Sequence, residues 1–428
     1  MRVLGLVLMV LAVPARAEDG TQIDWVGDWK EAFRQAKQTG KPVMVCINSK
    51  DDEQANERAA QKTYRDAWFV PMTRRFVMIV VSVRQHASEG ACPRFGKVTC
   101  KEHLACWKEL RVEHGDEFLL PDTTDEMISP QHAWFRPDGK LLQRKEYELF
   151  RDQLLERMQA VLAACGPSPN AGAPVDDRDR AALERARKGD KEARWAAFGI
   201  LFASEKTAVR AALVDLLKST KAKPPKCELL RAFGRGKVLD ARPMVESLLK
   251  DNDADVRSFA AVCLEEMASA DSVATLIKRA KVERDAMVRK NLYRALGACG
   301  GPAADKAAAR ALLKAVADDS QKMVCKHAAL ALRHYAGAGS KLVRKRLEQL
   351  ASQMKDEDVR QAIVCALAYV GNQKSTVRVL EKVLEKTVEE WKLKFVHSAI
   401  AKLRGEKVYF ATQWLYWDDN NDPARKEG

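Results

Sequence analysis

Apolar positions in the first part of the chain follow two different periods. Residues 28–39 place apolar side chains at i, i+3, i+4 and i+7, which predicts an amphipathic helix. Residues 43–47 are a short, wholly apolar run, and residues 77–83 are apolar apart from Ser82; both are rich in β-branched side chains, which is typical of buried strands. Residues 132–135 and 141–144 flank a Pro-Asp-Gly turn and predict a β-hairpin. This order of elements predicts a layered α/β fold.

The second half of the chain reads almost entirely as helix and repeats itself. Corresponding helices open with a valine at intervals of 32, 36 and 35 residues, at Val256, Val288, Val324 and Val359. Alanine and leucine follow each valine at helical spacing. Such repeats form helix pairs that stack, because neither helix buries its apolar stripe alone. Residues 178–405 are therefore predicted to form an all-α solenoid.

The repeated motif resembles HEAT repeats, in which a loop aspartate precedes a Val-Arg pair. The resemblance implies a ladder of aspartate–arginine contacts along the stack. The matching pairs are Asp255 with Arg257, Asp285 with Arg289, and Asp358 with Arg360. The third copy departs from the pattern, since Asp318 and Asp319 come earlier and Lys322 or Lys326 replaces the arginine.

The N-terminal region resembles thioredoxin-like domains over residues 18–165. The phrase Trp29-Lys30-Glu31-Ala32-Phe33, followed by Gly40-Lys41-Pro42-Val43, is similar to the opening of bacterial members. The turn and hairpin at residues 128–140 place Pro130 where that family carries a cis-proline beside its active site. The resemblance therefore implies a thioredoxin-like α/β sandwich, followed by the HEAT-like solenoid.

The reactive part of that family is missing. A working member carries a Cys-x-x-Cys pair at the start of the helix after the first core strand, where the helix N-terminus lowers the thiol pKa. This chain has Asn48-Ser49-Lys50-Asp51-Asp52-Glu53 there, which predicts a plain helix start capped by Ser49 and Asp52. We expect a redox-inactive domain and no enzymatic activity.

An insert at residues 84–127 carries the remaining candidate chemistry: Cys92, Cys100, His103 and Cys106. Three interpretations stay open, namely a local disulfide between two of the cysteines, unpaired thiols, and a zinc site. No cofactor is expected apart from that zinc alternative. The alternative function is a thiol–disulfide oxidoreductase that uses Cys92, Cys100 or Cys106 in place of the missing pair.

Targeting and boundary signals divide the chain further. Residues 1–17 combine Arg2, a short apolar run and an Ala-x-Ala site, which predicts a secretion signal and a periplasmic or extracellular protein. Residues 166–177 form a Pro/Gly-rich linker. Residues 406–428 are aromatic and are predicted to cap the last repeat, with Trp414 and Trp417 over its open face. The acidic stretch after Trp417 is typical of a frayed end.

Charge is unevenly distributed along the chain, whose net charge is +14. Residues 18–166 carry a net −2, whereas residues 167–428 carry a net +14. A basic solenoid favours an acidic protein partner, with an anionic glycan or a lipid surface as alternatives. Nucleic acid is the least expected partner of an exported protein, and no stretch of the mature chain is predicted to cross a membrane. The predicted function is non-catalytic protein binding or scaffolding in the cell envelope.

Overall fold

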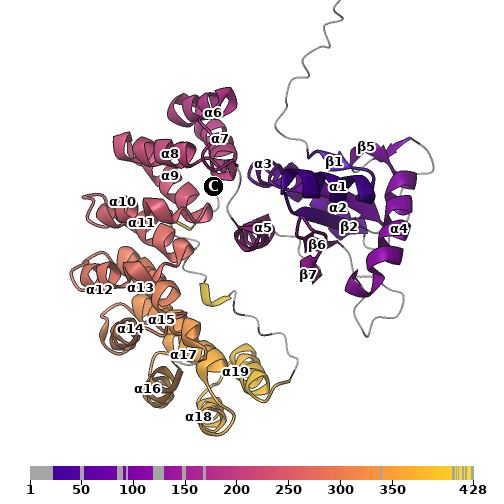
Figure 1. Ribbon diagram of the computed structural model, residues 1–428. Helices are drawn as coiled ribbons and strands as arrows, with labels where there is room; N and C mark the ends of the chain where they lie inside the picture. The colour runs from indigo at the N-terminus through magenta and orange to yellow at the C-terminus, as the bar shows by residue number, and fades with distance from the viewer. Residues whose placement is uncertain are drawn as a thin grey trace, which may run out of the picture. The chain divides into compact units, whose positions relative to one another are not determined.

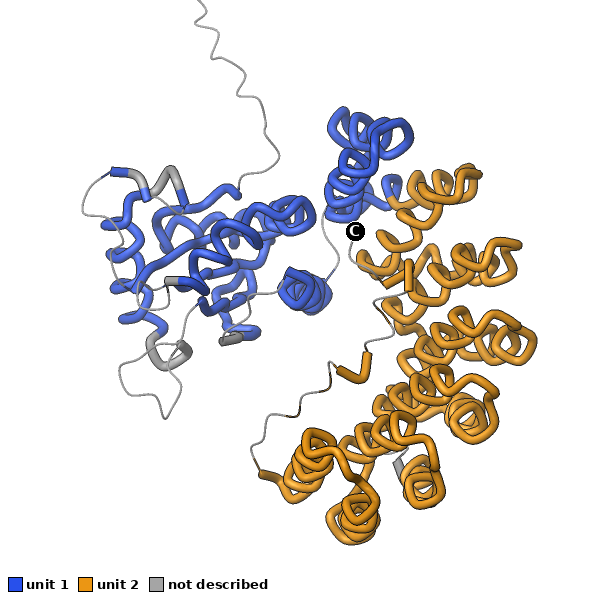
Figure 2. The backbone as a smooth tube through the Cα atoms, turned by 180° about the vertical axis from the view of Figure 1, so that it is seen from behind, with its two compact units in different colours: residues 1–209 blue, residues 210–428 orange. Residues whose placement is uncertain are grey.

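The computed structural model describes most of the chain and divides it into two compact units, residues 1–209 and 210–428 (Figure 2). The described residues are 23–48, 53–83, 90–92, 95–118, 130–146, 151–166, 170–337, 340–406, 410, 412, 414–416, 419 and 422–425. The predicted secretion signal, the Ser49–Asp52 cap and Trp417 lie outside them. Each unit is described by itself.

The first unit contains two sheets and helices of different lengths (Figure 1). The elements are β1 (Trp25–Val26), α1 (Trp29–Thr39), β2 (Val43–Asn48), α2 (Glu53–Gln61), the 3₁₀ turn η1 (Thr63–Arg65), α3 (Phe69–Thr73), β3 (Val77–Ser82), β4 (Ala91–Cys92), β5 (Gly96–Thr99), α4 (Cys100–Phe118), β6 (Gln131–Phe135), β7 (Leu141–Glu146), α5 (Arg151–Cys165), α6 (Asp177–Lys188), α7 (Lys191–Ala203) and α8 (Thr207–Ser219), which continues into the second unit.

The main sheet is mixed, with strand order β1-β3-β2-β6-β7. The first three strands are parallel, and the predicted hairpin β6–β7 adds to β2 in antiparallel register. Central strands β2 and β3 are buried at every position, as their apolar composition predicted. The hairpin is joined by the predicted turn, where Gly139 has a φ of +89° that glycine adopts without strain.

Helix α1 begins and ends where the sequence predicted. Asp28 caps it, since its Oδ1 accepts a hydrogen bond of 2.7 Å from the Glu31 N–H. Gly40 ends it in the left-handed conformation, with φ +70°. The buried side of α1, at Ala32 and Ala36, packs with strands β2 and β3 in the core of this domain.

The insert supplies part of that same core. A capping box begins α4, in which the Thr99 N–H donates to Glu102 and the Glu102 N–H donates to Thr99. Helix α4 contacts β3 and contributes Cys106, Trp107 and Leu110 to the core with α1. The segment between β3 and β6 is therefore a structural layer of the domain over these described residues.

Helix α7 packs against the segment around α3 within the first unit. Trp68 lies 5.0 Å from Trp195 and 5.5 Å from Phe202 between ring centroids. Gly199 permits this approach, because a Cβ at that position would lie 2.1 Å from the Ala67 carbonyl oxygen. The first helix pair after the predicted linker thus belongs to the same compact unit as the sheet.

The second unit is a curved stack of helix pairs (Figure 1). Its elements are α9 (Lys223–Arg235), η2 (Leu239–Ala241), α10 (Arg242–Leu248), α11 (Ala254–Met267), η3 (Ala270–Ser272), α12 (Val273–Ala280), α13 (Ala286–Gly300), α14 (Lys306–Asp318), α15 (Lys322–Ala331), η4 (Leu332–Tyr335), α16 (Ser340–Gln353), α17 (Glu357–Val370), α18 (Ser375–Leu384) and α19 (Glu390–Leu403). The predicted solenoid is confirmed. The four repeat valines are each at most 2% exposed. No described helix is both long enough and apolar enough for a bilayer crossing.

Consecutive inner helices contact one another along the stack. These are α9, α11, α13, α15, α17 and α19, and they form the concave side of the arc in Figures 1 and 2. Helices α12, α14, α16 and α18 form the outer layer. We call the surface of the inner helices the concave face.

The ladder arginines bind acidic residues other than the expected ones. Arg257 forms a bidentate contact with Glu283, with distances of 2.9 and 3.1 Å. Arg289 does the same with Asp319, at 3.0 and 3.2 Å. Each arginine therefore reaches the loop that begins the next inner helix. The acidic partner of each arginine therefore belongs to the following repeat, whereas the aspartate of the expected pair belongs to the same repeat as the arginine.

The expected aspartates have other roles. Asp285 caps α13 by accepting from the Val288 N–H at 3.0 Å, and Asp255 pairs with Lys223. Asp358 forms no ion pair within the described repeats, and Arg360 donates to the Met354 carbonyl at 3.1 Å. The third copy keeps a ladder contact through lysine, since Lys322 lies 2.7 Å from Asp356.

Candidate functional site

The end of β2, near which thioredoxin-like domains carry their dithiol, holds a buried neutral polar cluster. Cys46 pairs in register with His132 of β6, next to the buried Pro130. The Tyr64 hydroxyl lies 2.8 Å from His132 Nε2. Phe95 of the insert packs on Tyr64, with ring centroids 6.1 Å apart. The cluster is therefore covered by aromatic side chains.

Burial keeps these groups uncharged at neutral pH. Burial raises the pKa of the Cys46 thiol to about 12, although a hydrogen bond with Tyr64 opposes the shift. Burial also lowers the pKa of His132 to about 3. A thiolate is the nucleophile in disulfide exchange, and Cys46 supplies none near pH 7.

The four candidate residues of the insert are buried. Cys92 lies on β4, and Cys100, His103 and Cys106 lie on α4. His103 is 0% exposed, while Cys92 and Cys100 are each 1% exposed. Cys100, His103 and Cys106 follow one another at three-residue spacing, so they share a buried side of α4. Burial raises the pKa of Cys106 to about 12.

Metal binding by this segment stays a prediction. Within the described part of the chain, no three or more His, Cys, Asp or Glu side chains are grouped so that they could hold a metal ion. The disulfide among the insert cysteines also stays a prediction.

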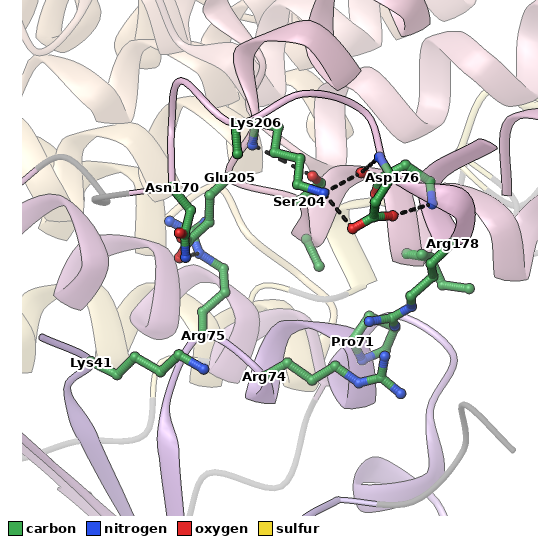
Figure 3. A pocket seen from close by; sticks show the side chains of 14 residues that line it. Lys41, Pro71, Arg74, Arg75, Asn170, Asp176, Arg178, Ser204, Glu205 and Lys206 are labelled. Atoms are coloured by element: carbon green, nitrogen blue, oxygen red, sulfur yellow. Dashed lines mark hydrogen bonds and ion pairs between the residues drawn. The ribbon is translucent and has the colours of Figure 1, made fainter. Parts of the chain in front are cut away.

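A polar pocket of about 230 Å³ lies in the first unit, between α3 and the start of α6 (Figure 3). The carboxylates that line this pocket form ion pairs with basic side chains of the same pocket. Glu205 binds Arg75 at 2.9 Å, and Lys206 binds Asp176 and Asp179 at 2.5 and 2.8 Å. Lys41, Arg74 and Arg178 also line it, which leaves the pocket with a surplus of positive charge.

A buried charge cluster lies on the concave face of the second unit. Lys290 of α13 has a fully buried side chain, and its Nζ lies 2.9 Å from Asp419 and 2.8 Å from Asp422. Arg294, one turn further along α13, donates to Asp419 at 2.6 Å. Both aspartates belong to the C-terminal segment. The concave face thus binds an acidic stretch of the same chain.

Neighbouring groups satisfy the remaining polar atoms of this cluster. Asn291 donates from Nδ2 to Ser258 and to Asp422, at 2.7 Å each. Arg425 donates to Asn291 Oδ1 at 2.8 Å and pairs with Glu265. Buried polar networks stabilise a structure when their members are satisfied in this way.

The charge states of the carboxylates follow from these contacts. Burial alone would raise the pKa of Glu265, but Arg294 and Arg425 outweigh it and lower the pKa to about 2. Burial likewise opposes ionisation of Asp419, and Arg294 and Lys290 hold its pKa well below the usual range. These carboxylates therefore carry full charge at neutral pH.

Aromatic residues attach the same segment to later repeats. Phe410 stacks on Phe395 of α19 with ring centroids 4.7 Å apart, and Trp414 lies 5.2 Å from the same ring. Trp414 therefore contacts the last inner helix, while the cap over the open face of the last repeat stays a prediction. Further along, Arg333 donates to the Tyr416 hydroxyl, and the Arg294 guanidinium lies 5.0 Å from the Tyr416 ring centroid.

The C-terminal segment crosses the repeats in reverse order, from α19 at Trp414 to α13 at Asp419 and α9 at Pro423, whose carbonyl accepts from Arg231 at 3.0 Å. Its acidic part was predicted to be a frayed end, and the ion pairs of Asp419 and Asp422 with Lys290 show that this was wrong for these two residues. The signal was available in the order of the residues after Phe410, where a group of aromatic residues is followed by a group of aspartates.

A family match supports the repeat assignment over part of the second unit. A family model described as HEAT repeats matches residues 241–333. Among solved structures, the chain is similar to the CpcE–CpcF complex of phycocyanin lyase from Nostoc sp. PCC7120, at 18% identity, over 54% of this chain and 97% of that chain, with a TM-score of 0.33. It is also similar to an engineered protein, at 18% identity and the same coverage, with a TM-score of 0.32. A comparison with curated proteins finds no match.

Proposed function

We propose that this chain is a non-catalytic, protein-binding scaffold of the cell envelope. A HEAT-repeat model matches residues 241–333, and repeats of this kind present extended surfaces for protein contact. The observation that carries the proposal is the concave face, where Lys290, Arg294 and Arg333 hold the C-terminal segment through charge and aromatic contacts. A surface that binds one such segment has the chemistry to bind another.

The proposal includes a thioredoxin-like N-terminal domain that has lost its redox activity. Its support is the strand order β1-β3-β2-β6-β7, with an antiparallel hairpin beside β2 and Pro130 at the start of β6. The high pKa of the Cys46 thiol supports the loss of activity. Export rests on the predicted signal at residues 1–17.

An acidic protein is the partner class that the charge distribution favours. The basic half of the chain would steer such a partner and speed encounter, while buried contacts would set how long it stays. An anionic glycan or a lipid surface shares the electrostatic attraction but presents no aromatic side chains beside its acidic groups.

The binding claim is tested by capture of proteins from envelope extract with the full chain, in low and raised salt. A variant with Arg294→Leu and Arg333→Leu serves as the comparison. The proposal expects proteins that the wild type retains and the variant loses. If the wild type and the variant capture the same proteins, a role for the concave face is contradicted. If all captured proteins are lost in moderate salt, their binding depends on charge attraction alone.

The alternative, a thiol–disulfide oxidoreductase, has its own test. Insulin reduction is measured with the mature chain and with Cys92→Ser, Cys100→Ser and Cys106→Ser variants. The scaffold proposal expects the background rate in all four proteins. Turnover that any one of these substitutions abolishes would replace it with the enzymatic function.

A further inference from the structure

The C-terminal segment is held like a bound peptide rather than like another repeat. Its described part contains two fully buried apolar residues, Leu415 and Ala424, and its other contacts are ion pairs, hydrogen bonds and ring contacts. Pro423 and Ala424 line a small pocket of about 60 Å³ together with Ser258 and Val288 of the inner helices. The segment therefore uses discrete anchor points, as extended peptides do in grooves.

The anchors have a fixed spacing. Tyr416, Asp419 and Asp422 follow one another at three-residue intervals, and each meets basic groups of the concave face. The fully buried Lys290 meets both aspartates. A site that buries a lysine between two carboxylates selects for acidic residues, because an apolar occupant would leave that charge unpaired.

We propose that the concave face is a recognition groove for an extended acidic segment of a partner protein, with an aromatic residue and two aspartates spaced Tyr-x-x-Asp-x-x-Asp. The chain's own C-terminal segment occupies this groove in cis and competes with the partner. This inference rests on the proposed function and adds to it the chemistry of the ligand and the control of access.

Competition in cis has a calculable effect. A tethered segment has an effective concentration of roughly 1 mM. If the same segment binds in trans with a dissociation constant of roughly 10 μM, the tether weakens apparent trans binding by about 100-fold. Partner binding therefore requires release of the C-terminal segment or a partner of higher affinity.

The test uses a fluorescein-labelled synthetic peptide of residues 410–428 and fluorescence anisotropy. It is titrated with the full chain and with a full-length variant carrying Asp419→Asn and Asp422→Asn. The matched control, Glu385→Gln with Glu406→Gln, removes the same charge from two exposed positions. We expect binding by the Asp variant, and apparent affinity about 100-fold weaker for the wild type and the control.

Peptide variants test recognition without disturbing the protein. Replacing Asp419 and Asp422 of the peptide by asparagine, or scrambling its sequence at constant composition, should abolish binding. If the Asp variant is unstable, a second variant is used, in which a protease site is inserted between Glu406 and Phe410 of the otherwise unchanged chain. Cleavage at this site separates the C-terminal segment from the repeats, so that the labelled peptide can exchange with it.

Several outcomes would overturn the inference. Equal peptide affinity for wild type and Asp variant would show that the segment does not compete. Folded protein that never binds the peptide, before or after cleavage, would make the segment a permanent structural part. Concentration-dependent dimers of the Asp variant would assign the groove to a second copy. None of these results would abolish capture through other surfaces, so the proposed function is tested separately.

Discussion

Substitution of Lys290 by methionine tests how the C-terminal segment is held. Methionine keeps much of the side-chain length and removes the charge. In the native chain this side chain is 0% exposed, and its Nζ lies 2.9 Å from Asp419 and 2.8 Å from Asp422. The substitution leaves Asp422, which is also 0% exposed, with Asn291 at 2.7 Å and Arg425 at 3.8 Å.

The expected cost is about 3–5 kcal/mol, which is typical when one partner of a buried ion pair is removed. Lys322→Met provides a matched control. Lys322 contacts Asp356 at 2.7 Å, but its side chain is 78% exposed, so its loss should cost about 0–1 kcal/mol. The two substitutions make the same chemical change. They differ in the burial of the lysine and in its partner, because Lys290 contacts the C-terminal segment whereas Lys322 contacts Asp356.

Urea unfolding followed by far-UV circular dichroism measures both variants, with the midpoints compared at equal m-values. Adding Asp422→Asn to Lys290→Met should recover part of the loss, because the double variant no longer buries an unpaired carboxylate. The reasoning is refuted if Lys290→Met lowers the midpoint no more than Lys322→Met does.

Three further predictions concern other contacts. Gly199→Val should destabilise the first unit by at least about 2 kcal/mol, since a Cβ would lie 2.1 Å from the Ala67 carbonyl; a thermal midpoint that does not fall would contradict this packing. Cys46, with its pKa raised to about 12, should resist Ellman's reagent at pH 8 until the chain is unfolded. Glu265 has a folded pKa of about 2 against an ordinary 4.5, so its contribution is present above pH 4.5 and is lost as the pH falls toward 2. Glu265→Gln should flatten that part of the stability profile measured by urea midpoints.

Local patterns predicted the elements well. The helical spacing of Trp29, Ala32 and Ala36 located α1, and the valines of the repeats located four inner helices. The insert was harder to interpret, because its cysteines drew attention to metal and disulfide chemistry. The pair Thr99 and Glu102 was a readable capping signal for α4.

Long-range partners could not be predicted from the same patterns. Arg257 meets Glu283 rather than Asp255 because the stacking of one repeat on the next decides which loop it reaches. The contact of Asp419 with Lys290 spans 129 residues, and no local period encodes it. Contacts of this kind depend on how the whole arc folds, so they become visible only in three dimensions.

The most direct test of the central claim is photo-crosslinking from the C-terminal segment of the intact chain. Benzoylphenylalanine replaces Tyr416, whose ring centroid lies 5.0 Å from the Arg294 guanidinium and 5.9 Å from the His327 ring. After illumination of dilute protein, mass spectrometry should find crosslinks within one chain to peptides from α13 and α15. Crosslinks only between chains, or none to the inner helices, would contradict a concave face that holds its own acidic segment.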